Sequence, residues 1–501
     1  MRLLRDLPLI IVLLGLAGLA MLLPAAFALA TGETRLAAIF GRAALLATAA
    51  AGVLGAATAG YRPDAPERSQ LVSLVAAYAV LPPVLAWPVA EAMPQFGFAR
   101  AWFEMVSAFT TTGASLLPPG AATPAPVHLW NALVGWLGGF LVLLAATALL
   151  APLNLGGLEV ANPRPAGRPA FAASPIHDAP DAGLRLVANL KLLAPIYAAL
   201  TLALWMGLLM AEETPFVALA HAMGVLSTSG ISPLGGIEAA RAGWPGEALM
   251  LGFLVFAMTR RSLPGGFPGD RRRVLHRDPE LRLALVLVLG LALVLLVRIE
   301  LAGADDGLAE AMASFWGAVF TLASFLTTTG YVSSEWAGGL ERAGLAPPAL
   351  LLAGVAMVGG GVATTAGGIK LLRVLALYRH GRHEMERLVE PALVAGGGER
   401  ARHLRSDGAY LAWVAFMLFV LSLAGAVAVL ALSGLAFEPA LVLAIAALST
   451  TGPLASTAGD PGMSYAALDG AQRSLLAAIM VLGRLELLAI VALLVPESWR
   501  R

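Results

Sequence analysis

Four short hydroxyl-rich segments are the residues in this sequence best suited to chemistry. They read FTTTG at 109–113, LSTSG at 226–230, LTTTG at 326–330 and LSTTG at 448–452. Short hydroxyl side chains beside a glycine make a poor hydrophobic core and a poor catalytic triad. Hydroxyl and carbonyl oxygens are, however, the hard donors that replace the water shell of a dehydrated alkali metal ion. The segments therefore raise the hypothesis of a cation-binding site.

The same unit surrounds each segment, which indicates an internal repeat. A short apolar stretch, which we expect to be too short to span a membrane alone, precedes each segment, and two long apolar segments flank it. Self-similarity of this kind is typical of repeat architecture, and four repeats can close a pseudo-fourfold ring around one ion pore. We expect an N-terminal helix pair at 1–62 and repeats at 63–165, 166–278, 279–400 and 401–501. Their filter loops are predicted at 109–115, 226–232, 326–332 and 448–454.

The composition indicates an all-α integral membrane protein with many crossings. The chain has 501 residues, of which 58% are hydrophobic and only 13% charged, and its formal net charge is +1. Such a composition is too apolar for a soluble protein of this length. The absence of cysteine excludes disulfides and thiolate metal sites. Ten apolar cores are expected, at 8–30, 36–60, 71–90, 126–151, 192–210, 245–259, 281–299, 347–377 (interrupted), 408–433 and 472–495.

The distribution of basic residues predicts the orientation. With a cytoplasmic N-terminus and one crossing for each apolar core, most of the 33 Lys and Arg residues fall on the cytoplasmic side. The positive-inside rule therefore places both termini in the cytoplasm. The densest basic patches are Arg271–Arg273 and Arg379–Arg405. They either set the topology or contact a partner, and the sequence leaves both interpretations open.

A ring of four such loops would form a cation selectivity filter. Non-helical backbone at membrane depth is tolerated only where protein buries it or water lines it. Each short helix would direct its partially negative C-terminal end at the pore, and glycine would supply backbone freedom. The filter residues are predicted to be Thr111, Thr112, Gly113, Thr228, Ser229, Gly230, Thr328, Thr329, Gly330, Thr450, Thr451 and Gly452.

Further motifs carry a resemblance to a known family. The filter loops, GGGVATTAGGIK at 359–370 and GRLE at 483–486 resemble the TrkH/KtrB/HKT superfamily of potassium transport proteins. The TrkH branch is the most similar, because two extra helices within 8–60 precede the first repeat. WLGG at 136–139 and RDPELR at 277–282 are similar to TrkH-type segments. Two departures are Phe140-Leu141 after WLGG and the unmatched TRRSLPGGFPG at 259–269.

The resemblance implies potassium uptake across the cell inner membrane by a homodimer with one pore per subunit. It also implies a cytoplasmic TrkA-type ring of nucleotide-binding regulatory subunits. Potassium is the substrate, and the chain itself would bind no organic cofactor and no nucleic acid; its surroundings are the lipid bilayer. The implied potassium ligands are Thr111, Thr112, Thr228, Ser229, Thr328, Thr329, Thr450 and Thr451.

A second candidate site is the glycine-rich stretch within the third repeat. Each glycine costs a helix roughly 1 kcal/mol against alanine, so the helix must break there, either as a kink for close packing or as a moving part. The resemblance implies an intramembrane gate under the filter, which we assign to the gate loop 359–370. The gate residues are Gly359, Gly360, Gly361, Gly367, Gly368, Lys370 and Arg484.

Two cations accompany this loop. Lys370 either repels potassium at the pore or extends to the cytoplasmic edge of the membrane. Arg484 lies near the middle of the last apolar core, where a charge needs a partner. Backbone carbonyls of the broken helix are better candidates than Glu486, which points elsewhere on a continuous helix. Arg484 therefore serves the gate or anchors helix packing.

Other functions were weighed against potassium uptake. Sodium or sodium/potassium transport is the main alternative within the same fold. In the family, a serine in place of the first filter glycine favours sodium, whereas all four positions here are glycine. A membrane-embedded enzyme is disfavoured, because His128 and His221 have no evident catalytic partner. A secondary carrier would show two halves rather than four quarter-repeats, and no phosphate-binding glycine loop precedes a strand.

Overall fold

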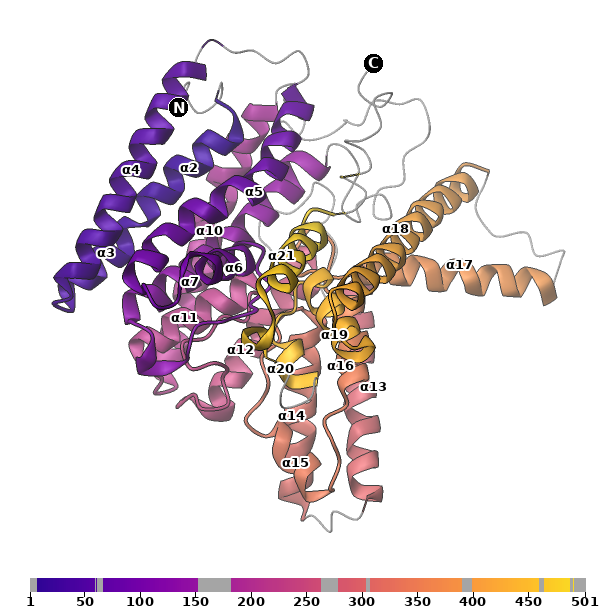
Figure 1. The fold of residues 1–501 in the computed structure, drawn as a ribbon. Coiled ribbons are helices and arrows are strands. Elements are labelled where there is room, and N and C mark those ends of the chain that lie inside the picture. Colours follow the sequence, from indigo (N-terminus) through magenta and orange to yellow (C-terminus); the bar gives the residue numbers. More distant parts are fainter. Residues whose placement is uncertain are drawn as a thin grey trace.

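The structure is a computed structural model, and it is helical throughout the part of the chain that it describes. That part comprises residues 7–58, 60, 66–151, 182–262, 278–302, 307–389, 399–458, 464–486 and 490, and it contains no strand. Figure 1 shows one body of packed helices from which α17 (Leu371–Val389) projects, together with the first part of α18 (Glu399–Leu432). The expected all-α fold is confirmed for these residues.

The chain begins with the predicted helix pair. Its first member is one apolar span, Leu9–Ala30, divided at Met21 into α2 (Leu9–Ala20) and α3 (Leu22–Ala30). The second is α4 (Thr34–Thr58), which packs along both of them. Gly18 allows this close approach, since a methyl group there would lie 2.7 Å from Cγ2 of Thr48. The pair also packs against the first unit of the remaining chain, through α2 with α5 and α3 with α7.

Four units then follow, each with a long helix, a helix that ends at a hydroxyl-rich segment, and a further helix. Neighbouring helices within each unit are in contact. The units are α5 (Pro66–Ala92), α6 (Phe98–Phe109) and α7 (Ala125–Ala145); α10 (Ala182–Met210), α11 (Pro215–Ser227) and α12 (Gly243–Met258); α13 (Pro279–Leu301), α14 (Leu308–Leu326) and α16 (Ala349–Val358) with α17; and α18, α19 (Phe437–Leu448) and α21 (Gly470–Arg484).

Short elements complete these units. A π-helical turn, η2 (Ala146–Leu150), extends α7, and a 3-10 turn, η3 (Arg260–Ser262), follows α12. The remaining ones are η1 (Gly120–Ala122), α15 (Trp336–Arg342), α20 (Leu454–Ala458) and η6 (Tyr465–Ala467), which connect the filter segments to the next helix.

Eight described helices are long and apolar enough to cross a membrane. They are Leu9–Ala30, Thr34–Thr58, Arg68–Ala92, Ala125–Leu150, Gly183–Met210, Pro279–Leu301, Leu308–Leu326 and Gly408–Leu432. Seven of them coincide with predicted apolar cores. The predicted cores at 245–259 and 347–377 correspond to shorter helices, and the core at 472–495 extends beyond the continuously described residues.

One expectation about helix length is wrong. The stretch before each filter segment was expected to be too short to span a membrane, but α14 has 19 residues and is long enough. Relative to its filter segment, α14 begins more than a full helical turn earlier, at Leu308, than α6, α11 and α19 begin relative to theirs. It nevertheless ends at its filter segment, as α6, α11 and α19 do at theirs.

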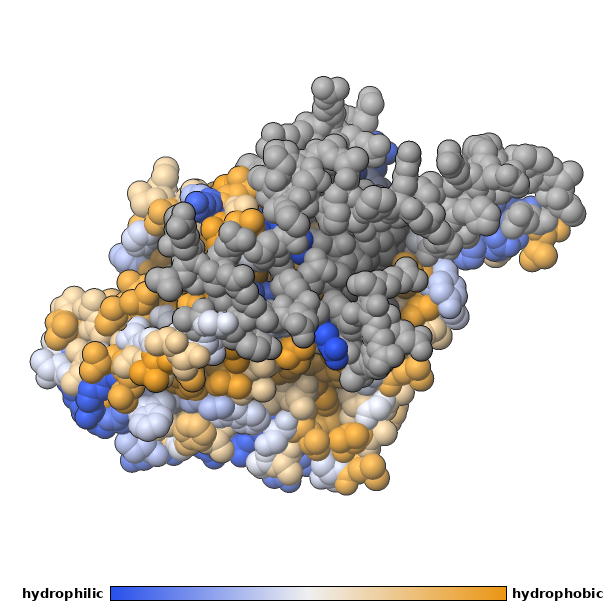
Figure 2. Space-filling model, turned by 90° about the horizontal axis from the view of Figure 1, so that it is seen from above, coloured by the Kyte–Doolittle hydropathy of each residue, from blue (hydrophilic) through white to orange (hydrophobic). Residues whose placement is uncertain are grey.

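The outer surface has the character of a lipid-facing protein. Large apolar side chains stand exposed on α4, α13 and α18, for example Leu45, Val286 and Leu421. Figure 2 shows wide apolar areas, in orange, over the part of the surface that it colours. A soluble protein does not expose so much contiguous apolar surface. The chain is therefore a multi-pass membrane protein.

Candidate functional site

The four hydroxyl-rich segments meet in a closed ring. Each glycine lies so tightly against the next segment that a methyl group added to it would overlap that neighbour. The atom nearest to the added methyl carbon would be Ser229 O at 2.0 Å for Gly113, Thr329 O at 2.0 Å for Gly230, Pro453 Cγ at 2.9 Å for Gly330 and Ala114 N at 2.2 Å for Gly452. The order is therefore first to second to third to fourth, and back to the first.

All four segments share one backbone conformation that proteins seldom adopt. The second hydroxyl residue is left-handed in each, with φ of 55° at Thr111, 53° at Thr228, 58° at Thr328 and 56° at Thr450. A β-branched residue in this region is an outlier that costs of order 1–3 kcal/mol and persists only where the surroundings enforce it. Four repetitions of the same strain point to function.

The strained residue also completes a helix-ending motif in every repeat. The next residue donates its N–H to the carbonyl five positions back, which is the Schellman pattern, with threonine where glycine is usual. The bonds are Thr112 to Ser107 (2.8 Å), Ser229 to Gly224 (2.9 Å), Thr329 to Ser324 (2.9 Å) and Thr451 to Ala446 (2.8 Å).

Hydrogen bonds between hydroxyl groups stiffen each segment. The first and third hydroxyl groups share a bond, at 2.8 Å for Thr110 and Thr112, 2.9 Å for Ser227 and Ser229, and 3.1 Å for the other two segments. The third hydroxyl thus braces its own loop. The assignment of Thr112, Ser229, Thr329 and Thr451 as potassium ligands stays a prediction.

The backbone carbonyls form the chemically open part of the ring. In the first three segments φ is positive at the threonine and at the glycine but not between them, and such alternation turns successive carbonyls to one side. The carbonyl oxygens of Thr111, Thr228, Thr328 and Thr450 accept no hydrogen bond from any described residue. All four residues are fully buried. Buried carbonyls without a donor are what a cation would need.

The fourth segment departs from the pattern. Gly452 does not adopt a positive φ, its N–H donates to Thr112 O at 2.5 Å, and its carbonyl accepts from the hydroxyl of Tyr465 at 2.8 Å. The helix α20 begins almost at once, at Leu454. The fourfold symmetry of the ring is therefore approximate.

The glycine-rich gate loop lies against three of the four filter segments. As the glycines predict, no helix spans the interval between Val358 and Leu371. The loop's Gly367 N–H donates to Thr328 Oγ1 at 2.8 Å, and the hydroxyl of Thr365 donates to Leu226 O at 3.2 Å. A methyl group on Gly367 would lie 2.3 Å from Ser449 O. The loop is thus packed tightly against the second, third and fourth segments.

The glycines at the two ends of the loop pack on each other. Gly359, with φ of 73°, has room for no methyl group, because the carbonyl oxygen of Gly367 would lie 2.2 Å away. The N–H of Ile369 donates to Met357 O at 2.9 Å and closes the loop at its neck. A methyl group on Gly360 would lie 2.5 Å from Ala257 O at the end of α12. The helix is therefore broken and closely packed, and the role of the loop as a moving part stays a prediction.

Arg484 reaches the gate loop in the way the sequence suggested. Its side chain is buried, and Nη1 donates to the backbone carbonyl of Thr365 at 2.8 Å. A carbonyl of the broken helix is thus its partner. Lys370, also buried, donates from Nζ to Ala366 O within the same loop. Lys370 therefore does not extend to a membrane edge in this structure.

Sequence reasoning missed an ion pair beside these cations. Arg373 and Glu486 lie 3.0 Å apart, nitrogen to oxygen, and line one cavity together with Lys370 and Arg484. The sequence suggested a helix through residue 495, which placed Glu486 on a different face. The helix instead ends at Arg484, and Glu486 adopts a φ of 56° that turns its carboxylate toward α17.

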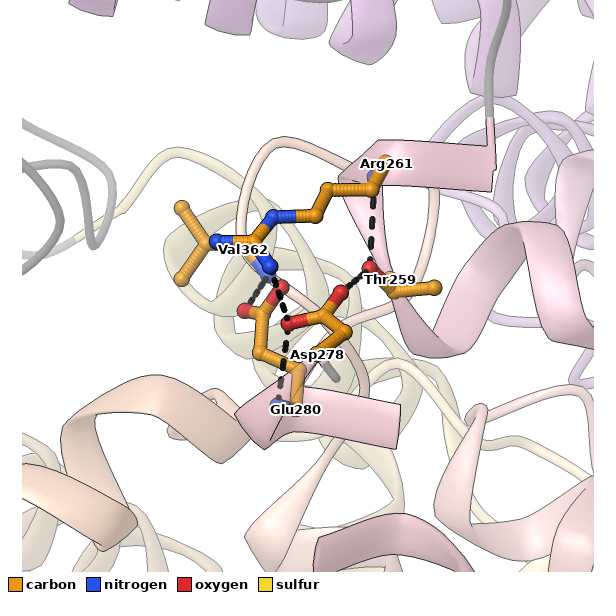
Figure 3. A network of polar contacts seen from close by, with 5 residues as sticks. All are labelled: Thr259, Arg261, Asp278, Glu280 and Val362. Atoms are coloured by element: carbon orange, nitrogen blue, oxygen red, sulfur yellow. Dashed lines mark hydrogen bonds and ion pairs between the residues drawn. The ribbon is translucent and has the colours of Figure 1, made fainter. Parts of the chain in front are cut away.

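The other half of the gate loop is held from the start of α13. Figure 3 shows the network: the Glu280 carboxylate accepts the N–H of Val362 at 2.9 Å, and Asp278 caps the helix by accepting the N–H of Glu280 at 3.3 Å. Arg261 pairs with Asp278 at 3.5 Å, and the Thr259 hydroxyl donates to the same carboxylate. The sequence drew attention to RDPELR only as a family-like segment, without this role.

Two other groups of residues bear on the sequence expectations. Arg271–Arg273 lie outside the described residues, whereas Arg379 and Arg382 are exposed on α17. His128 contacts Gly120 O at 3.3 Å and His221 contacts Ser232 Oγ at 2.9 Å. Among the described residues no cluster of His, Cys, Asp or Glu fits a metal ion.

A multi-pass helical protein with four buried hydroxyl-rich segments in one ring is a cation transport protein of the four-repeat class. The family model named TrkH, described as a cation transport protein, matches residues 270–500. The Trk system potassium uptake protein TrkI of Halomonas elongata is 29% identical over 436 residues, 85% of this chain and 82% of that protein. TrkH of Escherichia coli K12 is 25% identical over 450 residues, 87% and 88% of the two chains.

A solved structure has the same fold. The crystal structure of the potassium transporter TrkH from Vibrio parahaemolyticus matches over 100% of both chains, with a TM-score of 0.80 and 23% identity. The chain is thus similar to TrkH-type proteins both in its sequence and in its fold. The relatives named here are transport proteins.

Proposed function

We propose that the protein mediates potassium uptake across the inner membrane, with ions passing through the ring of the four filter segments. The observation that carries the proposal is the ring of buried carbonyls at Thr111, Thr228, Thr328 and Thr450, which lack donors among the described residues. The names of the relatives, Trk system potassium uptake proteins, support the choice of ion.

The glycines favour potassium over sodium on physical grounds. Gly113, Gly230 and Gly330 have φ of 74°, 62° and 82°, where a side chain would be strained. A side chain at Gly113 or Gly230 would also press on the carbonyl of Ser229 or Thr329 in the next segment. These glycines thus keep the first three segments alike, so that the ring offers several weak carbonyl dipoles to a large, easily dehydrated ion.

The gate loop 359–370 closes the path beneath the filter in the resting state. Its support is the contact with three filter segments and the hydrogen bond from Arg484 to Thr365 O. Lys370 and Arg484 add positive charge at this point, which raises the energy of a cation there. Opening requires the loop to leave these partners.

Both termini lie in the cytoplasm in this proposal, and the protein works as a homodimer with a TrkA-type nucleotide-binding ring. The positive-inside rule supports the orientation. The ring is proposed to dock on the projecting helix α17, because this helix follows the gate loop directly and exposes Arg379 and Arg382. Charge complementarity steers association of this kind.

Ion flux into liposomes that contain the purified protein tests the proposal. Potassium and rubidium are expected to pass in the presence of the regulatory ring, with sodium excluded or slower. A measured sodium preference would make the protein a sodium transporter of the same fold, and no flux of either ion would refute the transport proposal. Empty liposomes and liposomes with a protein that lacks 359–368 serve as the two reference states.

A further inference from the structure

A second fourfold pattern lies behind the filter, and three of the four repeats contain it. Nine positions before the filter glycine stands a buried polar residue, and a serine stands two positions after the glycine in the first and second repeats and three positions after it in the third. In each case the two are hydrogen-bonded: Ser115 Oγ donates to Glu104 Oε1 at 2.8 Å, His221 Nε2 lies 2.9 Å from Ser232 Oγ, and Ser333 N–H donates to Thr321 Oγ1 at 3.1 Å. We call these three pairs the filter struts.

Each strut ties the outer end of a filter segment back to the helix that leads into it. The serine hydroxyl also accepts the N–H two residues further on, at 3.2 Å from Leu117, 3.1 Å from Leu234 and 3.2 Å from Glu335. The serine therefore fixes a local turn and links it to the helix at once. The first and second repeats build the strut through the serine hydroxyl, and the third builds it one residue later through the serine N–H. A link of this kind in three repeats is a built feature rather than a chance contact.

The first strut has the strongest chemistry. Glu104, which is 1% exposed, accepts three hydrogen bonds: from the Ser115 hydroxyl, from the N–H of Leu116 at 2.7 Å and from the amide of Asn131 at 2.7 Å. All of its partners lie on the filter segment or on α7. Bonds to a carboxylate are roughly twice as strong as neutral ones. Glu104 is thus directed at the back of the filter and away from the ring.

The second and third struts use other residues for the same purpose. The Ser232 hydroxyl donates to Gly236 O at 2.6 Å, so that His221 supplies the proton of their bond from Nε2. The Ser333 hydroxyl donates to the Glu247 carboxylate at 2.7 Å, and Glu247 comes from α12 of the preceding repeat. The third filter segment is therefore braced by its own repeat and by its neighbour.

The fourth repeat has no strut. Leu443 stands nine positions before Gly452, and Leu454 and Ala455 stand two and three positions after it; all three are buried apolar residues. This is also the segment in which Gly452 departs from positive φ and bonds to Thr112 O and Tyr465 instead. The filter glycine thus has a positive φ in the three segments that have a strut, and it lacks a positive φ in the segment without one.

We propose that the filter struts are positioning residues that determine ion selectivity by preventing the carbonyl ring from contracting. This inference rests on the proposed function. A smaller ion such as sodium gains full coordination only if the carbonyls move inward. A strut behind the segment resists that movement, because it fixes the residue two or three positions beyond the glycine to a buried helix.

Removal of a serine hydroxyl tests the proposal with little change in volume. Ser115→Ala and Ser232→Ala each lose the strut and the turn bond. The potassium-to-sodium flux ratio in liposomes is expected to fall by about tenfold for Ser115→Ala, as the loss of one hydrogen bond to a charged group allows, and by less for Ser232→Ala. Ser456→Ala is the matched control: Ser456 is exposed in the repeat without a strut and donates only to Pro453 O at 2.8 Å.

Substitutions of Glu104 separate geometry from charge. In Glu104→Gln the carboxamide oxygen accepts the N–H of Leu116, and its NH₂ group donates to Ser115 and to Oδ1 of Asn131, which has no partner among the described residues. Glu104→Gln is therefore expected to keep the flux ratio, whereas Glu104→Ala loses it. If Glu104 acted by attracting cations, Glu104→Gln would lower potassium flux as strongly as Glu104→Ala.

Three outcomes would overturn the inference. They are an unchanged flux ratio in Ser115→Ala and Ser232→Ala, an equal loss in Ser456→Ala, or a loss in Glu104→Gln as large as that in Glu104→Ala. A role in folding alone would lower the thermal stability of Ser115→Ala and leave its ratio at the wild-type value, which also refutes the proposal. Failure of the wild-type protein to pass potassium or rubidium would instead refute the proposed function.

Discussion

The hydrogen bond between Arg484 and the carbonyl of Thr365 gives the gate its most direct quantitative test. It joins the last long helix to the gate loop at 2.8 Å, and both residues are buried. Arg484→Gln removes the charge and shortens the side chain, so that the bond is lost. We expect the resting flux of rubidium into liposomes to rise, because the closed position of the loop loses a partner that the displaced position does not have.

The size of the effect follows from the bonds that hold the loop. A hydrogen bond to a charged group contributes about 1.5–3 kcal/mol, and the bonds that join the loop to Arg484 and to the Glu280 carboxylate are of this kind. Since about 1.4 kcal/mol changes an equilibrium tenfold, loss of the Arg484 bond shifts the balance toward the displaced loop by roughly ten- to a hundredfold. Thr365→Ala, which removes only the neutral bond to Leu226 O, is expected to shift it by about fivefold.

Two measurements decide the matter. Rubidium flux is followed with the regulatory ring absent and present, and folding is checked by the thermal transition of the purified variant. Resting flux of Arg484→Gln equal to that of the wild type, in a protein with an unchanged thermal transition, would refute the reasoning and leave Arg484 as an anchor of helix packing. The ratio of Arg484→Gln to Thr365→Ala then distinguishes the charged bond from general loosening of the loop.

Three further predictions concern the filter, the gate and the partner. Gly113→Ser is expected to lower the potassium-to-sodium flux ratio, because a side chain at φ of 74° is strained and presses on Ser229 O. An unchanged flux ratio would place the filter elsewhere. Lys370→Gln, or deletion of several residues within 359–368, is expected to raise resting flux, and low flux with a normal nucleotide response would exclude the loop as the gate. Charge reversal of Arg379 and Arg382 together with Arg271–Arg273 is expected to weaken co-purification with the regulatory ring, and full retention would reduce these residues to topology signals.

The sequence was sufficient for the fold because the apolar cores are long and the filter pattern recurs. Predicted cores such as 36–60 and 281–299 agree within a few residues with Thr34–Thr58 and Pro279–Leu301. The ends of the short helices could also be predicted from the sequence, since four hydroxyl-rich segments interrupt the apolar pattern. The length of α14 was not, because an apolar run of 19 residues carries no signal that distinguishes a spanning helix from one that stops at a filter.

The site was predicted less completely, for a reason visible at Glu486. Its place depends on the end of α21 at Arg484, and an apolar pattern that continues beyond residue 486 hides that end. Glu104 and Glu280 were missed for the opposite reason. Each is a single carboxylate in an apolar or charged stretch. Val362 lies far along the chain from Glu280, and that contact arises from packing, which no local pattern encodes. Ser115 and Leu116 lie only 11 and 12 residues from Glu104, and the recurring spacing around the filter glycines is the signal that could have identified it.

The way the gate loop is attached suggests how a movement in the cytoplasm reaches the filter. One end of the loop continues directly into α17, which projects from the body of the protein (Figure 1). Its first half is bonded to Glu280 at the start of α13, beside Arg261 and Asp278. Movement of α17 away from α13 would therefore pull the loop against the bond between Glu280 and Val362. Glu280→Gln keeps an acceptor for the Val362 N–H but removes its charge, so it is expected to raise resting flux less than Arg484→Gln does. An increase as large as that of Arg484→Gln would show that the bond between Glu280 and Val362 holds the loop closed at least as strongly as the bond to Thr365 does.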